Sequence, residues 1–283
     1  MTSSSPAARA GVSRRPPKVG RSDAVDLDTT YAIAGLSGAI VGLLLTLFGG
    51  GGSVLATPLL IYAVGVKDPH VAIGTSAAAV AVNALIGLLS QAKAGRVKWP
   101  CALVFGGAGL TGSLLGAHLA KQIDGQALLG WFALAMLLVG LSMLRTPKTL
   151  GDPQVHLDRR LTTRLAPIGG VTGLVAGFFG IGGGFLIVPG LMAATGMTLA
   201  SAAASSLVSV ALFGAATSAS YAVSGLVDWP IFFALVLGGA LGAALGLVIA
   251  PKLSASAIVA RRLFAAMIVL TALYVAWRAL GAA

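Results

Sequence analysis

Ten apolar runs, separated by short polar segments, account for most of the 283 residues. Most of them approach the ~20 residues that an α-helix needs to cross a bilayer, whereas the second run of each half of the chain is shorter. A polar stretch at 145–164 divides the runs into two groups of five. The runs are residues 31–48, 54–66, 71–92, 100–120, 127–144, 165–180, 184–197, 199–223, 230–250 and 259–281. This pattern predicts an all-α integral membrane protein.

The composition indicates that lipid surrounds most of the chain. Hydrophobic residues make up 57% of the sequence and charged residues only 10%, with a mean hydropathy of +0.94, whereas soluble domains are about 25% charged. The net charge of +11 would indicate nucleic acid in a soluble protein. Here we expect the basic residues to face anionic lipid headgroups and to set the topology, with no nucleic-acid partner. The single cysteine, Cys101, excludes a disulfide framework and a cysteine zinc cluster.

The two groups of runs align with each other, which indicates a tandem duplication. Gly49–Pro58 aligns with Gly180–Pro189 at an offset of 131 residues, and the later runs align at an offset of 130. The later matched pairs are Thr75 with Ser205, Ser76 with Ser206, Trp99 with Trp229, and Gly109, Gly112 and Gly116 with Gly239, Gly242 and Gly246. The predicted divisions are a disordered cytoplasmic tail at 1–30, a first transmembrane repeat at 31–146, a cytoplasmic linker at 147–164 and a second transmembrane repeat at 165–283.

The basic residues predict how the chain crosses the membrane, because Lys and Arg collect in cytoplasmic loops. We count the two short glycine-linked runs of each half as one net crossing. Each half then has four net crossings, both termini are cytoplasmic, and 14 of the 19 Lys and Arg residues lie on the cytoplasmic side. We therefore expect eight net crossings of the cell (inner) membrane, with the two halves in the same orientation.

Consecutive glycines at Gly49–Gly52 and Gly180–Gly184 interrupt apolar helices. Each glycine costs about 1 kcal/mol relative to alanine in a helix interior, so we expect a break in both places. A break in hydrocarbon leaves backbone groups unpaired unless they line a cavity or meet a ligand. The half-helices that begin near Ser53 and Gly184 would each offer free N–H groups and about +0.5 charge. Together they predict a midplane site for a monovalent oxyanion.

Polar side chains near the breaks complete the predicted site. The hydroxyls of the matched Thr/Ser pairs can reach a pocket beside the breaks, or they can bond to the carbonyls of their own helices. Asn83 either lines the pathway or forms an interhelical hydrogen bond. We expect no catalytic residue, metal ion or cofactor, because the apolar runs contain no carboxylate, metal-ligand cluster or Ser/His/Asp set. The predicted substrate-binding residues are Gly50, Gly51, Gly52, Ser53, Thr75, Ser76, Asn83, Gly182, Gly183, Gly184, Ser205 and Ser206.

At these residues the sequence resembles the sulfite exporter TauE/SafE family, also called the 4-toluene sulfonate uptake permease family. The family signature, G-x-G-G-G followed five residues later by Pro, is present at Gly180–Pro189 and in altered form at Gly49–Pro58, where Ser53 stands in place of the last glycine. The resemblance covers most of residues 31–281. It implies a multi-pass carrier in the inner membrane, in a family associated with sulfite, sulfoacetate and other organosulfur anions.

Together the residues and the resemblance predict a secondary transporter of a small sulfur-containing oxyanion, such as sulfite, sulfoacetate or another organosulfonate. Export is the favoured direction, because a monovalent anion leaving an inside-negative cell gains about 2.3 kcal/mol per 100 mV. The expected partners are a small anionic substrate and the lipid bilayer, and a homodimer stays open. The alternatives are an anion channel, a non-transporting membrane assembly protein and a membrane-embedded enzyme.

Overall fold

The computed structural model describes residues 21–144, 152, 155, 158–180, 184–254 and 257–281. These residues are almost entirely helical, and one isolated β-bridge among them joins Asp152 to Met197. In chain order the elements are α1 (Arg21–Phe48), the 3₁₀ segment η1 (Gly49–Leu55), α2 (Ala56–Leu59), the π-helical segment η2 (Leu60–Val64), α3 (Pro69–Lys93), α4 (Trp99–Ala120), α5 (Gly125–Leu144), α6 (Arg159–Phe179), α7 (Gly184–Thr195), α8 (Leu199–Val223), α9 (Trp229–Ser254) and α10 (Ala257–Gly281). The order of the predicted apolar runs and the all-α fold class are confirmed.

Two helices begin earlier than their apolar runs. α1 begins at Arg21, so the last part of the predicted tail at 1–30 is helical, and α6 begins at Arg159, inside the predicted linker at 147–164. Extending an existing helix adds one backbone hydrogen bond for each residue fixed, so a polar segment next to a membrane helix can continue it. Residues 1–20 lie outside the described residues.

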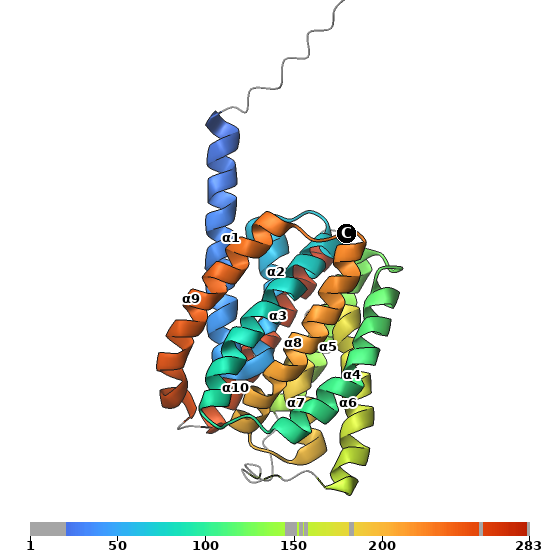
Figure 1. Cartoon of the computed structure of the whole chain (residues 1–283). Coiled ribbons are helices and arrows are strands. Elements are labelled where there is room, and N and C mark those ends of the chain that lie inside the picture. Colours follow the sequence, from blue (N-terminus) through green and yellow to red (C-terminus); the bar gives the residue numbers. More distant parts are fainter. Residues whose placement is uncertain are drawn as a thin grey trace, which may run out of the picture.

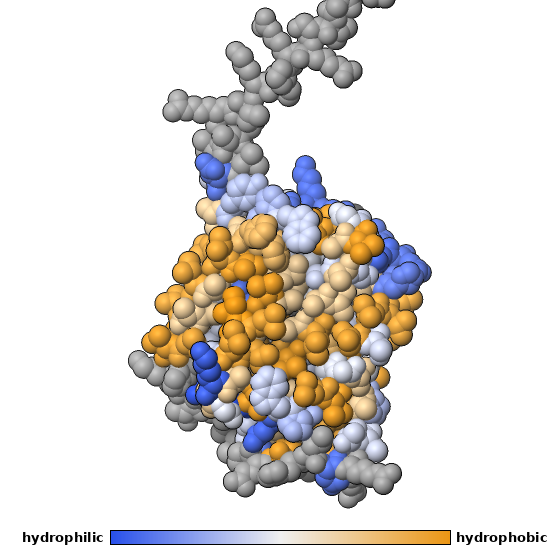
Figure 2. Space-filling view, viewed as in Figure 1, coloured by the Kyte–Doolittle hydropathy of each residue, from blue (hydrophilic) through white to orange (hydrophobic). Residues whose placement is uncertain are grey.

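The described part of the chain has six helices that are long and apolar enough to cross a membrane. They are Asp28–Val64, Pro69–Lys93, Trp99–Ala120, Gly125–Leu144, Leu199–Val223 and Trp229–Ile249. Leucines on three of them face outward, since Leu115, Leu138 and Leu237 are 61%, 61% and 69% exposed. Figure 2 shows this apolar surface as a broad band between polar ends of the body. A surface of this extent fits lipid rather than water, so the chain is a multi-pass membrane protein.

Glycines let two pairs of helices approach until their backbones touch. In the α1–α9 pair, a Cβ atom on Gly42 would overlap the backbone of Gly239, and in the α4–α6 pair, a Cβ atom on Gly173 would overlap the backbone of Gly109. Close contact through small residues is typical of membrane helices, whose association depends on packing rather than on exclusion of water. Each pair joins a helix of the first half to a helix of the second half, so the two halves interlock (Figure 1).

The matched helices α3 and α8 run in opposite directions. Gly74, near the start of α3, lies against Tyr221 near the end of α8, whereas Gly87, near the end of α3, faces Leu207 near the start of α8. The two helices occupy matched positions in the sequence alignment but are antiparallel in space. The prediction that the two halves share one orientation is therefore wrong.

The physical reason is that the chain turns back on itself at each glycine break. Gly52 lies against the backbone of Leu44 and Leu45 in α1, and a Cβ atom on Gly190 of α7 would lie 3.2 Å from the Thr172 hydroxyl of α6. The segment after each break thus returns along the helix before it and adds no net crossing.

The prediction of four net crossings for each half is corrected accordingly. The net crossings of the first half are then those of α3, α4 and α5, because the Asp28–Val64 span turns back at its break. Those of the second half are α8, α9 and α10, although α10 is not one of the six helices above. The start of the membrane part of α1 and the end of α10 lie at one face of the body, while the end of α5 and the start of α6 lie at the other (Figure 1). Which face is cytoplasmic stays a prediction.

Candidate functional site

The first break begins at Gly49, whose φ of 63° is the left-handed conformation that glycine adopts most readily. All residues from Gly49 to Val54 are buried. The Ser53 hydroxyl donates a hydrogen bond of 2.7 Å to the Gly50 carbonyl, so it satisfies one backbone group that the break leaves free. This predicted site residue therefore stabilises the broken segment itself.

The second break begins at Gly180 in the same way. Its φ is 66°, and its N–H donates to the carbonyl of Ala176 at 3.0 Å, which closes the last turn of α6. The chain resumes as a helix at Gly184, the first residue of α7. Of the predicted site residues, Gly182 and Gly183 lie outside the described residues.

The two breaks lie in direct contact. A Cβ atom added to Gly184 would coincide with the Gly50 carbonyl, and a Cβ atom added to Gly50 would lie 2.8 Å from the Cα of Gly184. Real Cβ atoms essentially never come closer than 3.0 Å to another heavy atom, so only glycine fits at both positions. We predicted from the sequence that the two breaks share one site. In the structure Gly50 and Gly184 are in contact.

Hydroxyl groups from α3 and α8 surround this contact. The Ser206 hydroxyl accepts a hydrogen bond of 2.9 Å from the Gly50 N–H and donates one of 2.7 Å to the Ala203 carbonyl. The matched residue Ser76 lies 2.8 Å, oxygen to oxygen, from the hydroxyl of Thr57 in α2. All three hydroxyl residues are at most 1% exposed. Ser206 therefore contacts the first break and Ser76 contacts the segment after it. Both hydroxyls also donate to carbonyls of their own helices, Ala203 and Ile73, which is the alternative role expected for them.

Thr57 belongs to the same cluster, although the sequence analysis did not select it. Thr57 could have been selected from the alignment, because it lies inside the aligned Gly49–Pro58 segment, directly before Pro58. The matched position in the second half is Val188, which carries no hydroxyl. The hydroxyl environments of the two breaks therefore differ.

Thr75 and Ser205 hold loops rather than the breaks. The Thr75 hydroxyl accepts a hydrogen bond of 2.8 Å from the backbone N–H of Asp228, and the Ser205 hydroxyl accepts one of 2.9 Å from the backbone N–H of Lys98. Lys98 and Asp228 are matched positions of the two halves, because they differ by the alignment offset of 130 residues. The two hydrogen bonds are therefore equivalent contacts made in opposite directions between the halves. Each joins a central helix to the loop that precedes α4 or α9 in the other half.

Asn83 lies at the contact between α3 and α9. It is 2% exposed, its amide group donates to the Leu235 carbonyl at 3.4 Å, and the absence of a side chain on Gly239 makes room for it. Its Oδ1 atom is buried without a hydrogen-bond partner among the described residues. The structure therefore shows the interhelical hydrogen bond, which was one of the two roles expected for this residue.

No charged side chain is buried near the breaks in the described part of the chain, so any positive potential there would come from the backbone. Among the described residues, those that are polar and fully buried are Ser, Thr, Asn or Gln, and none is Lys, Arg, Asp or Glu. No group of three potential metal ligands gathers in that part of the chain. The start of α7 at Gly184 carries the partial positive charge of a helix N-terminus, about +0.5. The hydroxyls of Ser53, Ser76 and Ser206 each donate to a backbone carbonyl, so the start of α7 is the feature beside the breaks that favours negative charge.

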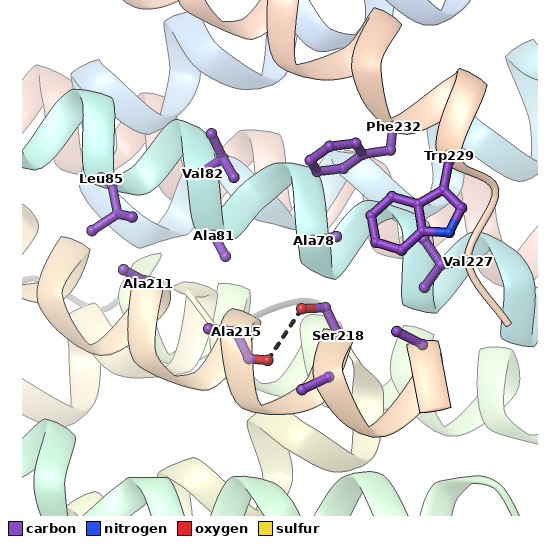
Figure 3. A pocket seen from close by; sticks show the side chains of 12 residues that line it. Ala78, Ala81, Val82, Leu85, Ala211, Ala215, Ser218, Val227, Trp229 and Phe232 are labelled. Carbon is purple, nitrogen blue, oxygen red and sulfur yellow. Dashed lines mark hydrogen bonds between the residues drawn. The ribbon is translucent and has the colours of Figure 1, made fainter. Parts of the chain in front are cut away.

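A groove of about 320 Å³ lies on another part of the central helices and shares no residue with the breaks. Alanines of α3 and α8 form its walls, and Trp229 and Phe232 lie at one end (Figure 3). The Ser218 hydroxyl in this groove is already bonded to the carbonyl of Ala215 at 3.1 Å. The lining is apolar and carries no charged residue, so the groove does not fit an anion.

A multi-pass helical membrane protein whose two broken helices meet in the interior has the architecture of a membrane transporter. Comparison with known families agrees. The sulfite exporter TauE/SafE family matches residues 34–275, so the chain belongs to this family.

The relatives found in a search of curated proteins are described as transporters. A probable membrane transporter protein of Xylella fastidiosa (strain Temecula1) is 46% identical over 243 residues, which cover 86% of this chain and 93% of the relative. The probable membrane transporter protein YunE of Bacillus subtilis (strain 168) is 29% identical over 253 residues, which cover 81% of this chain and 92% of the relative. No solved structure matched the chain. The chain is thus a membrane transporter of this family.

Proposed function

We propose that the protein is a secondary transporter that moves a small sulfur-containing oxyanion, such as sulfite, sulfoacetate or another organosulfonate, through a site at the two glycine breaks. The observation that supports this most strongly is the contact between Gly50 and Gly184, because it brings a helix start and uncharged hydroxyls together in the buried interior. Backbone N–H groups at a helix start bind anions without a buried cation.

Export through the cytoplasmic membrane is the favoured direction. A monovalent anion leaving an inside-negative cell gains about 2.3 kcal/mol per 100 mV, so efflux needs no coupling ion. Import would need coupling, and the described residues bury no carboxylate that could carry a proton.

Efflux from proteoliposomes tests the proposal. Vesicles are loaded in parallel with sulfite, sulfate, sulfoacetate and taurine, and the release of each compound is compared with that from protein-free vesicles. We expect saturable release of at least one sulfur oxyanion, accelerated by the same anion on the opposite side, as in a carrier. A channel would release the anion without this acceleration. Release equal to that of protein-free vesicles for all four compounds would refute the proposal.

The variant Ser206→Ala links the transport to the breaks. Removing the hydroxyl leaves the Gly50 N–H without its acceptor, which costs about 1–3 kcal/mol for a buried donor. We therefore expect the unfolding midpoint to fall and, because the break shifts, the apparent affinity for the transported anion to change. Ser218→Ala is the matched control, because that hydroxyl lies on the same helix but in the apolar groove (Figure 3). Equal affinities in the two variants would remove the breaks from the site.

A further inference from the structure

A phenylalanine ends the helix before each glycine break, and each one packs against a phenylalanine from the other half of the chain. Phe48 of α1 stacks on Phe264 of α10 with ring centroids 5.4 Å apart, and Phe179 of α6 packs on Phe132 of α5 at 5.6 Å. All four side chains are at most 7% exposed. The same aromatic contact thus occurs at both breaks.

The second phenylalanine of each pair, Phe264 of α10 and Phe132 of α5, also lies beside a break. The ring of Phe264 occupies the space where a Cβ atom of Gly51 would lie, so it packs directly on the broken backbone. The ring of Phe132 meets Phe185, the residue after Gly184, edge to face at 5.8 Å. Phe264 therefore packs on the backbone of the first break, and Phe132 reaches the second break through Phe185.

The rings belong to a pair of helices that packs mainly on itself. α5 and α10 contact each other far more than they contact the rest of the protein, and a Cβ atom on Gly140 of α5 would lie 2.7 Å from the Val269 side chain of α10. By contrast, the α1–α9 and α4–α6 pairs are joined by backbone contacts at glycines. The α5–α10 pair reaches the breaks through apolar rings, and such contacts involve no directional hydrogen bonds.

The two rings lie toward opposite faces of the membrane. The break covered by Phe264 begins at Gly49, which packs against Ala203 near the start of α8, while the other break begins at Gly180, which packs against Ile73 near the start of α3. Because α3 and α8 are antiparallel, their starts lie at opposite faces.

We infer that the α5–α10 helix pair is the gate of this transporter and that Phe264 and Phe132 are its two plugs, each of which separates the breaks from one face of the membrane. The inference rests on the proposed function for what passes the gate, but the gate itself can be tested without any cargo. Movement that withdraws one ring exposes the breaks to one face while the other ring stays closed, which is what alternating access requires.

The test measures how fast a thiol at the first break reacts with a cationic, membrane-impermeant maleimide, which carries no sulfonate and releases no leaving group. The native cysteine is removed by Cys101→Ala, and Ser53→Cys introduces the thiol. Ser53 is fully buried, so we expect slow labelling. Adding Phe264→Ala should raise the labelling rate by about tenfold or more from one face only, measured by comparing intact cells with inside-out vesicles, because a buried thiol reacts through the open population. Phe132→Ala should raise it from the opposite face.

Two further variants separate gating from a general loosening of the protein. Phe213→Ala also removes a fully buried ring, but this ring packs on Gly109 of α4 rather than on a break, so labelling should stay slow. Phe264→Leu keeps most of the volume and should give an intermediate rate. The inference is overturned if Phe213→Ala accelerates labelling as much as Phe264→Ala does, or if Phe264→Ala and Phe132→Ala act from the same face or change nothing. The labelling contains no sulfur oxyanion as cargo, so failure of the proposed transport leaves this result interpretable.

Discussion

The contact between the two breaks leads to a prediction about Gly184→Ala. The added methyl group would coincide with the Gly50 carbonyl, and Cβ atoms do not come closer than 3.0 Å to other heavy atoms, so the two breaks must separate. Overpacking of this kind costs about 1–3 kcal/mol. Separation also pulls the Gly50 N–H from the Ser206 hydroxyl, now 2.9 Å away. Losing that hydrogen bond leaves a buried N–H unpaired, at about 1–3 kcal/mol of stability, and the displaced start of α7 should reduce efflux.

The matched control is Gly87→Ala in α3. That glycine is also buried, but its added Cβ would lie 3.5 Å from the Leu207 side chain, an ordinary contact, and alanine is better than glycine in a helix by about 1 kcal/mol. Anion efflux per folded molecule and the unfolding midpoint in detergent are measured for both variants. We expect Gly184→Ala to lose efflux and Gly87→Ala to keep it with an equal or higher midpoint. Wild-type efflux in Gly184→Ala would refute the view that the close approach of the breaks builds the site.

Three further predictions concern the surrounding structure. Thr75→Val should leave the Asp228 N–H without its acceptor and lower stability by about 1–3 kcal/mol. The control Ser142→Ala removes an exposed hydroxyl and should leave the unfolding midpoint unchanged. Equal midpoints for the two variants would contradict the role of the Thr75–Asp228 hydrogen bond. Asn83→Leu should change stability by less than about 1 kcal/mol, because it removes a long hydrogen bond together with an unpaired oxygen. A large loss of efflux at an unchanged unfolding midpoint would instead place Asn83 in the transport pathway. In a Cys101→Ala background, Lys67→Cys and Ser224→Cys should be labelled from the same face of the membrane, because α3 and α9 start at the same face; labelling from opposite faces would restore the shared orientation of the two halves.

The helices and the breaks could be predicted from the sequence because their causes are local. An apolar run of about 20 residues has few alternatives to a membrane helix, and consecutive glycines at Gly49 and Gly180 destabilise a helix wherever it lies. The hydroxyls of Ser76 and Ser206 followed from their place after the breaks. These features depend on the residues themselves rather than on their neighbours in space.

The orientation of the halves could not be obtained in this way. The number of net crossings depends on whether the segment after a break continues through the membrane or turns back, and the contact of Gly52 with Leu44 that decides this is tertiary. The count of basic residues compared loops on the two faces of the membrane. Each loop had been assigned to a face on the assumption that the segment after a break continues through the membrane. Once the chain turns back, the basic loops are divided between both faces, so the charge bias that supported the shared orientation disappears.

The interlocking of the halves explains why two breaks can persist in the interior of a membrane protein. α1, which carries the first break, packs on α9 of the second half, and α6, which carries the second break, packs on α4 of the first half. Ser206 of the second half accepts the N–H of Gly50, and the Gly50 carbonyl lies against Gly184. A broken helix alone would leave unpaired backbone groups in hydrocarbon, at several kcal/mol each. Each half therefore supplies contacts that stabilise the break of the other, and the anion site that we propose exists only where the two halves meet.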